Sequence, residues 1–261
     1  MVTRDLRSKK VVAAVGEAAP PSLGLAFETP NDGTRSLADA VADVLVNAVA
    51  QGLLQPGQRL VEADIAGQLN ISRVPVREAF KILQTQGILK AVPNHGARVA
   101  PFNTADFDQV TEVRLALERI AARHAAETYR REPRRLDLLR ENVSRMERAS
   151  HWSDWAELRK LDVAFHHEFC KASENDIVLS LWEALARRIH IIFGREIASE
   201  QNFQVVINQH KKLITLFESG DTNIESEIES HILRLHSNRP KCDAGDLAGQ
   251  NRTITKFRPW S

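Results

Sequence analysis

Residues 60–99 constrain the fold more than any other stretch, because two short amphipathic segments meet there at a tight corner. The first segment breaks at Asn70, a residue type that tolerates a positive φ, and a turn is expected at that point. A second helix is predicted from Ser72, an oxygen-bearing residue suited to an N-cap, to Gly87. Its apolar face is formed by Val76, Phe80 and Leu83.

The second predicted helix also carries a cationic stripe. Arg73, Arg77 and Lys81 recur every four residues, so they share a face separate from the apolar one. After Gly87, two short segments at 88–92 and 97–100 flank Pro-Asn-His-Gly and predict a hairpin. A helix-turn-helix followed by a hairpin is a winged helix, whose cationic second helix suits the major groove of DNA. The alternative is a solvated charged face, which is the usual fate of such a stripe.

The remaining periodicity divides the chain into two folded parts. A helix that begins after Ser36, followed by a turn at residues 55–58, completes the winged helix. Beyond it, apolar stripes near period 3.6 predict helices at 104–129, 133–149, 153–173, 176–197, 202–219 and 221–237. The expected fold class is therefore mainly α, with an N-terminal winged helix-turn-helix domain followed by an all-helical bundle.

Boundaries follow from composition and from helix-start signals. Residues 1–33 and 239–261 mix Pro, Gly and charged residues without sustained periodicity, and both are expected to be mobile or disordered. The predicted divisions are a leader at 1–33, the winged helix at 34–100, a linker at 101–103, the bundle at 104–238 and a tail at 239–261.

Composition excludes several classes of protein. The formal net charge is +1, so any binding of nucleic acid must come from a local patch of cations rather than from the whole surface. No apolar run approaches the ~20 residues that span a bilayer, and the N-terminus lacks a secretory apolar core, which predicts a soluble cytoplasmic protein. Cys170 and Cys242 are the only cysteines and support neither a disulfide framework nor a thiolate metal site.

The motifs QPGQRL, SRVPVREAF, QGIL and NHG, in that order, resemble the N-terminal domain of the GntR family of bacterial transcription regulators. The resemblance covers roughly a quarter of the chain. It implies a homodimer on a palindromic double-stranded operator, and Ala63 departs from it where some relatives carry a DNA-contacting Arg. It also implies DNA contacts at Ser72, Arg73, Pro75, Arg77 and Lys81 of the second helix and at His95 and Gly96 of the wing tip.

Inside the predicted bundle, four polar side chains face the apolar side of their helices. Asp162 and His166 lie one turn apart, and His210 and His231 are each bracketed by apolar residues within about 60° of the helical wheel. One Asp and three His form a ligand set suited to Zn²⁺ or another divalent transition metal. The alternative is that each is a core histidine satisfied by a neighbour, but unpaired buried polar groups cost about 1–3 kcal/mol each, which favours a shared cation.

Three further histidines are left out of this set. His167 and His236 lie on other faces of their helices, and His124 is assigned to packing or a dimer contact.

A second resemblance covers these bundle residues. D-x3-H, then QHKKLITLFESGD, then a final His resemble the FCD ligand-binding domain of the FadR-like subfamily, an all-helical bundle. The resemblance implies metal ligation by Asp162, His166, His210 and His231, although the spacing before His231 is about one residue shorter than usual.

An open metal position would attract a small anion, most simply a carboxylate, with an arginine as a second clamp. Arg114 is the first choice for that clamp and Arg188 the second, because each lies beside the apolar stripe of its helix, although either could extend to solvent instead.

Three functions remain open at this point. The preferred one is a transcription regulator, not an enzyme, whose DNA affinity is controlled by a small organic acid bound beside the metal. A metal-dependent enzyme acting on a small organic acid is the alternative, but Glu168 points about 200° away from His166 and does not serve as the missing base. A third is a DNA-binding scaffold whose bundle only dimerises.

Overall fold

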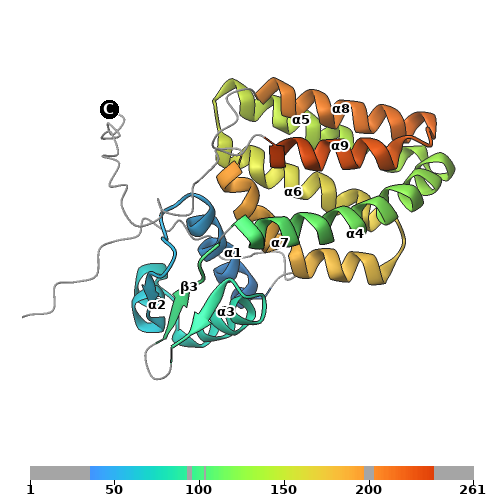
Figure 1. The fold of residues 1–261 in the computed structure, drawn as a ribbon. Helices are drawn as coiled ribbons and strands as arrows, with labels where there is room; N and C mark the ends of the chain where they lie inside the picture. Colours follow the sequence, from blue (N-terminus) through green and yellow to red (C-terminus); the bar gives the residue numbers. More distant parts are fainter. Residues whose placement is uncertain (1–35, 93–95, 103, 197–202, 238–261) are drawn as a thin grey trace, which may run out of the picture.

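The computed structural model describes residues 36–92, 96–102, 104–196 and 203–237, and these form two adjoining helical parts (Figure 1). The predicted leader and tail and residue His95 lie outside the described residues. The N-terminal part contains α1 (Leu37–Ala50), α2 (Glu62–Leu69), α3 (Arg73–Thr85) and a small sheet. The mainly α fold class with a winged helix before a bundle is confirmed.

The corner between α2 and α3 has the predicted backbone. Asn70 ends α2 in the left-handed region, at φ 52° and ψ 47°, and Gly87 follows α3 at φ +67°. Ser72 occupies the N-cap position of α3 with extended backbone, but its side chain makes no capping hydrogen bond. The position was predicted correctly, whereas the capping interaction is formed elsewhere, at Ser36, whose hydroxyl accepts from the Asp39 amide at 3.0 Å.

The hairpin is present and gains a third strand. Strands β2 (Leu89–Ala91) and β3 (Ala97–Val99) pair antiparallel, and β1 (Arg59–Leu60) pairs with the other edge of β3, giving the order β1-β3-β2. The sequence pattern indicates only a turn before residue 60 and does not reveal β1. A strand of two residues is too short to show an alternating pattern.

The second part is a bundle of long helices with its own apolar core. Its elements are α4 (Thr104–Arg131), a 3₁₀ turn (Pro133–Arg135), α5 (Leu136–His151), α6 (Trp155–Ala172), α7 (Asp176–Glu196), α8 (Phe203–Ser219) and α9 (Ile224–Ser237). Helix α4 packs against α6, α7 and α9, and α5 packs against α6 and α8. Among the described residues, no helix combines the length and apolarity that crossing a bilayer requires.

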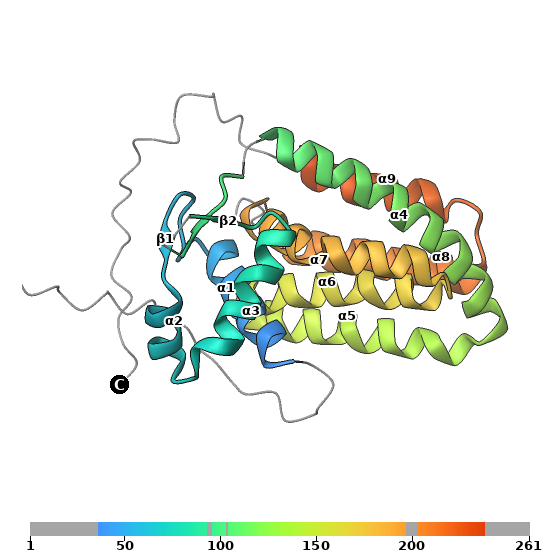
Figure 2. The ribbon, with the colours of Figure 1, turned by 90° about the horizontal axis from the view of Figure 1, so that it is seen from below.

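Helix α7 belongs to both parts. It packs within the bundle, and in both views it also lies beside α1 (Figures 1 and 2). Its Ile191 is fully buried in the apolar core of the winged helix, together with residues of α1, α3 and the sheet. The two parts therefore share one helix, and the side chains on opposite sides of α7 face different cores.

Candidate metal centre and nucleic-acid interface

The cations of α3 lie on its exposed side. Arg73, Arg77 and Lys81 are exposed, as is Ser72, and Pro75 is half-buried. Their helix is held by the opposite face, where Val76, Ala79, Phe80 and Leu83 are buried. An α-helix that presents cations on one side and packs on the other is the arrangement that enters a DNA groove.

Glu78 lies among these cations, and the sequence pattern did not single it out. Its Oε1 is 3.0 Å from Lys81 Nζ and 3.7 Å from Arg77 Nε. All three side chains are about half exposed, and ion pairs of this kind contribute about 0–1 kcal/mol. A phosphate can therefore replace Glu78 as the partner of Lys81 or Arg77.

The wing is held against β1 through a glycine. Gly96 has φ +82°, its carbonyl accepts from the Val92 amide at 3.0 Å, and a Cβ at this position would lie 2.3 Å from the Leu60 carbonyl oxygen. The backbone conformation and the close approach both require glycine. Gly96 therefore fixes the base of the wing tip on the sheet.

The four polar residues predicted to face the bundle interior come together at one point. Asp162 and His166 project from α6, His210 from α8 and His231 from α9, and each offers a ligand atom within 4.8 Å of the others. Their side chains are 0–1% exposed. Among the described residues this is the one group of His, Cys, Asp and Glu side chains with such geometry.

Hydrogen bonds on the outer side of the cluster orient two of the imidazoles. His166 Nδ1 lies 2.6 Å from Glu118 Oε2, and His210 Nδ1 lies 2.8 Å from the Val206 carbonyl. Since an ionised carboxylate and a carbonyl only accept, both Nδ1 atoms are assigned as donors. The Nε2 lone pairs of His166 and His210 then point toward the cluster, which is how neutral imidazoles bind metals.

Several side-chain atoms of the cluster are buried without a hydrogen bond. They are both carboxylate oxygens of Asp162, His210 Nε2 and His231 Nδ1. His210 Nε2 approaches Asp162 Oδ1 to 3.1 Å but without hydrogen-bond geometry, and the Nε2 atoms of His166 and His231 are 3.0 Å apart. A cation bound by all four residues would give the Asp162 carboxylate and His210 Nε2 a partner, so the side chains present fit a divalent metal.

Burial favours the neutral form of two histidines of the cluster, His166 and His231. Desolvation, and then the neighbouring His210, hold the pKa of His231 well below its usual value, and desolvation also lowers the pKa of His166. Burial opposes ionisation of Asp162, yet His210 and His166 beside it lower its pKa overall. Neutral imidazoles and one carboxylate are the protonation states that ligate a transition metal.

Glu118 of α4 lies beside the cluster and contacts it, and the sequence pattern did not reveal it. It is fully buried, and besides His166 it accepts from Arg114 Nε at 2.7 Å and from Trp182 Nε1 at 2.8 Å. Burial would raise its pKa, but the Arg114 guanidinium and His166 lower it from 4.5 to about 2. The sequence could have indicated Glu118, because this carboxylate lies one helical turn after Arg114 and directly after Leu117 of the apolar stripe.

The two arginines considered as effector clamps have different surroundings. Arg114 is 3% exposed and lies beside the cluster, where its charge lowers the pKa of Asp162. Arg188 extends instead toward the winged helix, where its Nη2 is 3.5 Å from the Gly87 carbonyl. The structure thus places Arg188 at the boundary between the two parts, because its side of α7 faces the end of α3.

The histidines left out of the set lie in other surroundings. His167 Nε2 is 2.8 Å from Glu183 Oε1 on α7, and His124 is half-buried on α4.

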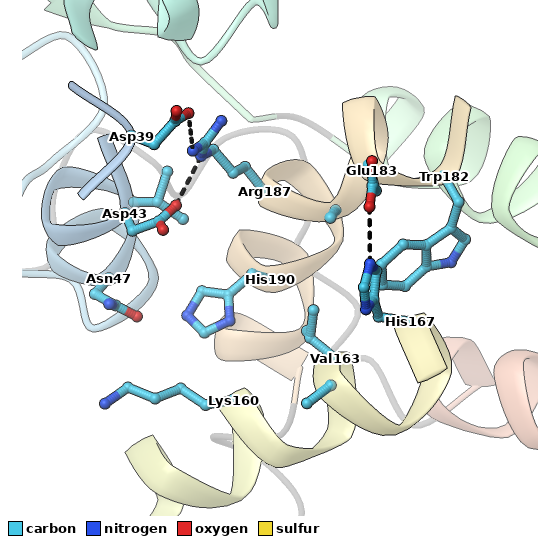
Figure 3. Close-up of a pocket in the computed structure, with 13 residues that line it drawn as sticks. Asp39, Asp43, Asn47, Lys160, Val163, His167, Trp182, Glu183, Arg187 and His190 are labelled. Atoms are coloured by element: carbon cyan, nitrogen blue, oxygen red, sulfur yellow. Dashed lines mark hydrogen bonds and ion pairs between the residues drawn. The ribbon is translucent and has the colours of Figure 1, made fainter. Parts of the chain in front are cut away.

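A cleft of about 660 Å³ is lined by residues of α1, α6 and α7, and one arginine reaches across it. Figure 3 shows Arg187 reaching from α7 to α1, where its Nη2 is 3.0 Å from Asp39 Oδ1 and its Nε is 2.8 Å from Asp43 Oδ1. His190 also lines the cleft, and burial lowers its pKa to about 4. Arg187 and Ile191 lie one turn apart, so this turn of α7 contacts the winged helix through both charge and apolar packing.

Comparison with protein families assigns both parts of the chain. Residues 37–99 match the family described as bacterial regulatory proteins, gntR family, and residues 109–234 match the FCD domain. The first match covers the winged helix, and the second contains all four residues of the buried cluster.

Individual proteins are similar to this chain over much of its length. The probable D-xylose utilization operon transcriptional repressor of Paenarthrobacter nicotinovorans is 30% identical over 201 residues, 77% of this chain and 85% of the relative. The Nta operon transcriptional regulator of Aminobacter aminovorans is 32% identical over 158 residues, 58% of this chain and 73% of that protein. The solved structure of E. coli McbR/YncC has a TM-score of 0.64 at 21% identity, covering 78% of this chain and 98% of that chain, and shares its fold.

Proposed function

This chain belongs to the GntR family of bacterial regulatory proteins and carries an FCD domain, and from that premise we propose how its binding to DNA is controlled. As a family member it is a DNA-binding transcription regulator. We propose that its operator affinity depends on a small carboxylate bound beside a divalent metal, most simply Zn²⁺, in the FCD domain. The proposed DNA contacts are Ser72, Arg73, Pro75, Arg77 and Lys81 with His95 and Gly96.

The observation that supports the metal is the group of buried side-chain atoms of the cluster without hydrogen bonds. Asp162, His166, His210 and His231 would hold the ion. Zn²⁺ held by these four residues would act as a Lewis acid and would bind an anionic oxygen as a fifth ligand. The nearby buried charges of Asp162, Glu118 and Arg114 leave one net negative charge, which a divalent ion converts to one net positive charge. A carboxylate effector would neutralise that charge, and Arg114 is the cation placed to contact it.

An enzymatic role would need a free acid or base beside the cluster. Glu118 is the buried carboxylate next to the cluster, and its two oxygens already accept from His166, Arg114 and Trp182. A general base must be within reach of the proton that it removes and must have a lone pair available. The alternative of a metal-dependent enzyme is therefore less well supported than a sensor.

Helix α7 provides a route from the cluster to the DNA-binding domain. Trp182 of α7 donates to Glu118, which in turn holds His166. About 7.5 Å farther along the same helix, Arg187 binds Asp39 and Asp43 of α1. Helix α1 packs on α3, the helix that carries the cations. We propose that a change at the cluster reorients α7 and so changes the position of α3.

We also propose that the protein acts as a homodimer, because a helix-turn-helix dimer reads two half-sites of a palindrome. Native mass spectrometry of the purified protein tests the stoichiometry and the bound metal together. A dimer that carries one zinc per subunit is expected. A monomer would contradict the proposed homodimer, and a protein without metal after incubation with zinc would contradict the proposed metal site.

The control of DNA binding is tested on an operator selected from random-sequence DNA by the purified protein. Operator affinity is measured with chelator, with zinc, and with zinc plus each member of a carboxylate panel. A change with metal and acid that is abolished in Asp162→Asn supports the proposal. Identical affinity under all conditions, or turnover of a carboxylate, would contradict it.

A further inference from the structure

Three cations form a row across the exposed face of the wing sheet. In the strand register Arg59 lies opposite Arg98, and Arg98 lies opposite Lys90. All three side chains are exposed, whereas the neighbouring Leu60, Leu89 and Val99 face the core and are buried. The row therefore arises from the sheet register, which unites residues that are separated by up to about 40 positions in the sequence.

Such a row has an electrostatic cost. Like charges directly opposite on adjacent strands lie about 4.5–5.5 Å apart at Cβ and destabilise the sheet. The central cation, Arg98, donates through Nη1 to the Gly57 carbonyl at 2.7 Å, which fixes its guanidinium but adds no negative charge. An external anion bound between Arg98 and Lys90 would relieve the repulsion between these two cations.

The row lies close to the part of the domain that approaches DNA. Lys90 and Arg98 are each two residues from the bonded pair Val92 and Gly96 at the wing tip, about 7 Å along the strands. Three adjacent strands span about 10 Å, so the three cations project from a short length of the sheet. Their long, flexible side chains can reach phosphates of one DNA strand.

We propose that Arg59, Arg98 and Lys90 form a second DNA-contacting surface, which binds backbone phosphates beside the groove that the wing enters. The contact is independent of sequence, because guanidinium and ammonium groups on a sheet face reach phosphates and not base edges. The row adds to the α3 cations. A chain whose formal net charge is only +1 attracts DNA through such local groups of cations.

The test compares the salt dependence of DNA binding in the full-length protein. The double variant Lys90→Gln/Arg98→Gln is measured by fluorescence anisotropy on the selected operator and on a random-sequence duplex, across a potassium chloride series. We expect affinity for both duplexes to fall by the same factor, and the slope of log K against log salt to decrease by about 0.9 for each phosphate that the variant no longer neutralises. The charge-retaining variant Lys90→Arg/Arg98→Lys should restore both values.

Lys171→Gln is the matched control, because Lys171 is an exposed cation near the C-terminal end of α6 in the bundle. Unchanged melting temperatures of the variants distinguish weaker DNA binding from unfolding. An unchanged salt slope in the double variant would overturn the proposal and point to an acidic protein as the partner of this row. A decrease in the affinity for the operator alone would overturn the proposal as well, because that result would indicate base recognition. A wild-type protein that binds neither duplex would instead refute DNA binding itself.

Discussion

Glu118 shows how one buried carboxylate can organise a site without being a ligand in it. Its two oxygens accept from an imidazole, a guanidinium and an indole that come from three different helices. Each donor compensates part of the cost of burying the charge, which is why its pKa is lowered to about 2 despite full burial. The orientation of His166, and through Trp182 the position of α7, both depend on this carboxylate.

Glu118→Gln should weaken zinc binding while leaving the fold intact. The amide has nearly the same shape but cannot accept from all three donors, so it no longer fixes the tautomer and orientation of His166. We expect a decrease of about 10–100-fold in zinc affinity, as for other groups that orient a metal ligand. Competition with a chromophoric chelator measures it, and Glu183→Gln, which changes an exposed carboxylate paired with His167, is the control. Equal zinc affinities of Glu118→Gln and wild type would refute this role.

Comparison of Gly57 with Gly96 distinguishes the backbone strain of a positive φ from the steric clash that a side chain would cause. Gly57, at φ +79°, has open space where a Cβ would lie, whereas a Cβ at Gly96 would be 2.3 Å from the Leu60 carbonyl oxygen. Gly57→Ala should cost about 1 kcal/mol of unfolding free energy through strain, and Gly96→Ala about 2–3 kcal/mol because β1 must also move. Urea unfolding compares the two variants. Equal decreases in stability would show that the close approach to β1 contributes nothing.

At the level of elements, the helices were predictable and the smallest strand was not. The predicted segments at 176–197 and 202–219 correspond closely to α7 and α8, because a long amphipathic helix repeats its apolar pattern several times. The inward faces of His210 and His231 followed from the same periodicity. Strand β1 is defined only by its pairing with β3, and no local pattern encodes a pairing partner. Glu118 was missed for a related reason, since two of its three donors come from other helices.

The dual contacts of α7 give Arg187 a specific predicted role. Its guanidinium bridges to Asp39 and Asp43 across a cleft, so its removal should leave the buried Asp/His cluster intact while loosening the link to α1. In Arg187→Ala we expect unchanged zinc affinity, and a ratio of operator affinities with and without zinc that falls toward one. Anisotropy under both conditions measures the ratio.

Arg123→Ala serves as the control for Arg187→Ala, because Arg123 of α4 pairs with Glu225 of α9 within the bundle, where its Nη1 lies 3.7 Å from Glu225 Oε1. A zinc-dependent ratio in Arg187→Ala that equals the wild-type value would show that α7 does not need the bridge to α1.

For the whole molecule, the cluster should determine how strongly the bundle resists unfolding. Four ligands from three helices meet in the core, and the ion they would share binds the folded chain only. Zinc buffered at one hundred times its dissociation constant should then raise the free energy of unfolding by about 2.7 kcal/mol. Because Ile191 of α7 is buried in the winged-helix core, we expect both parts to be stabilised together.

Urea unfolding followed by circular dichroism, with zinc or with chelator, measures this effect of the metal. Asp162→Asn should abolish the zinc-dependent increase, whereas Asp137→Asn, which changes an exposed carboxylate of α5, should keep it. A zinc effect of equal size in Asp162→Asn would place the ion elsewhere. Zinc could instead stabilise the bundle alone, while the winged helix unfolds in a separate transition that zinc does not shift. That result would show that the two parts unfold independently although α7 contacts both.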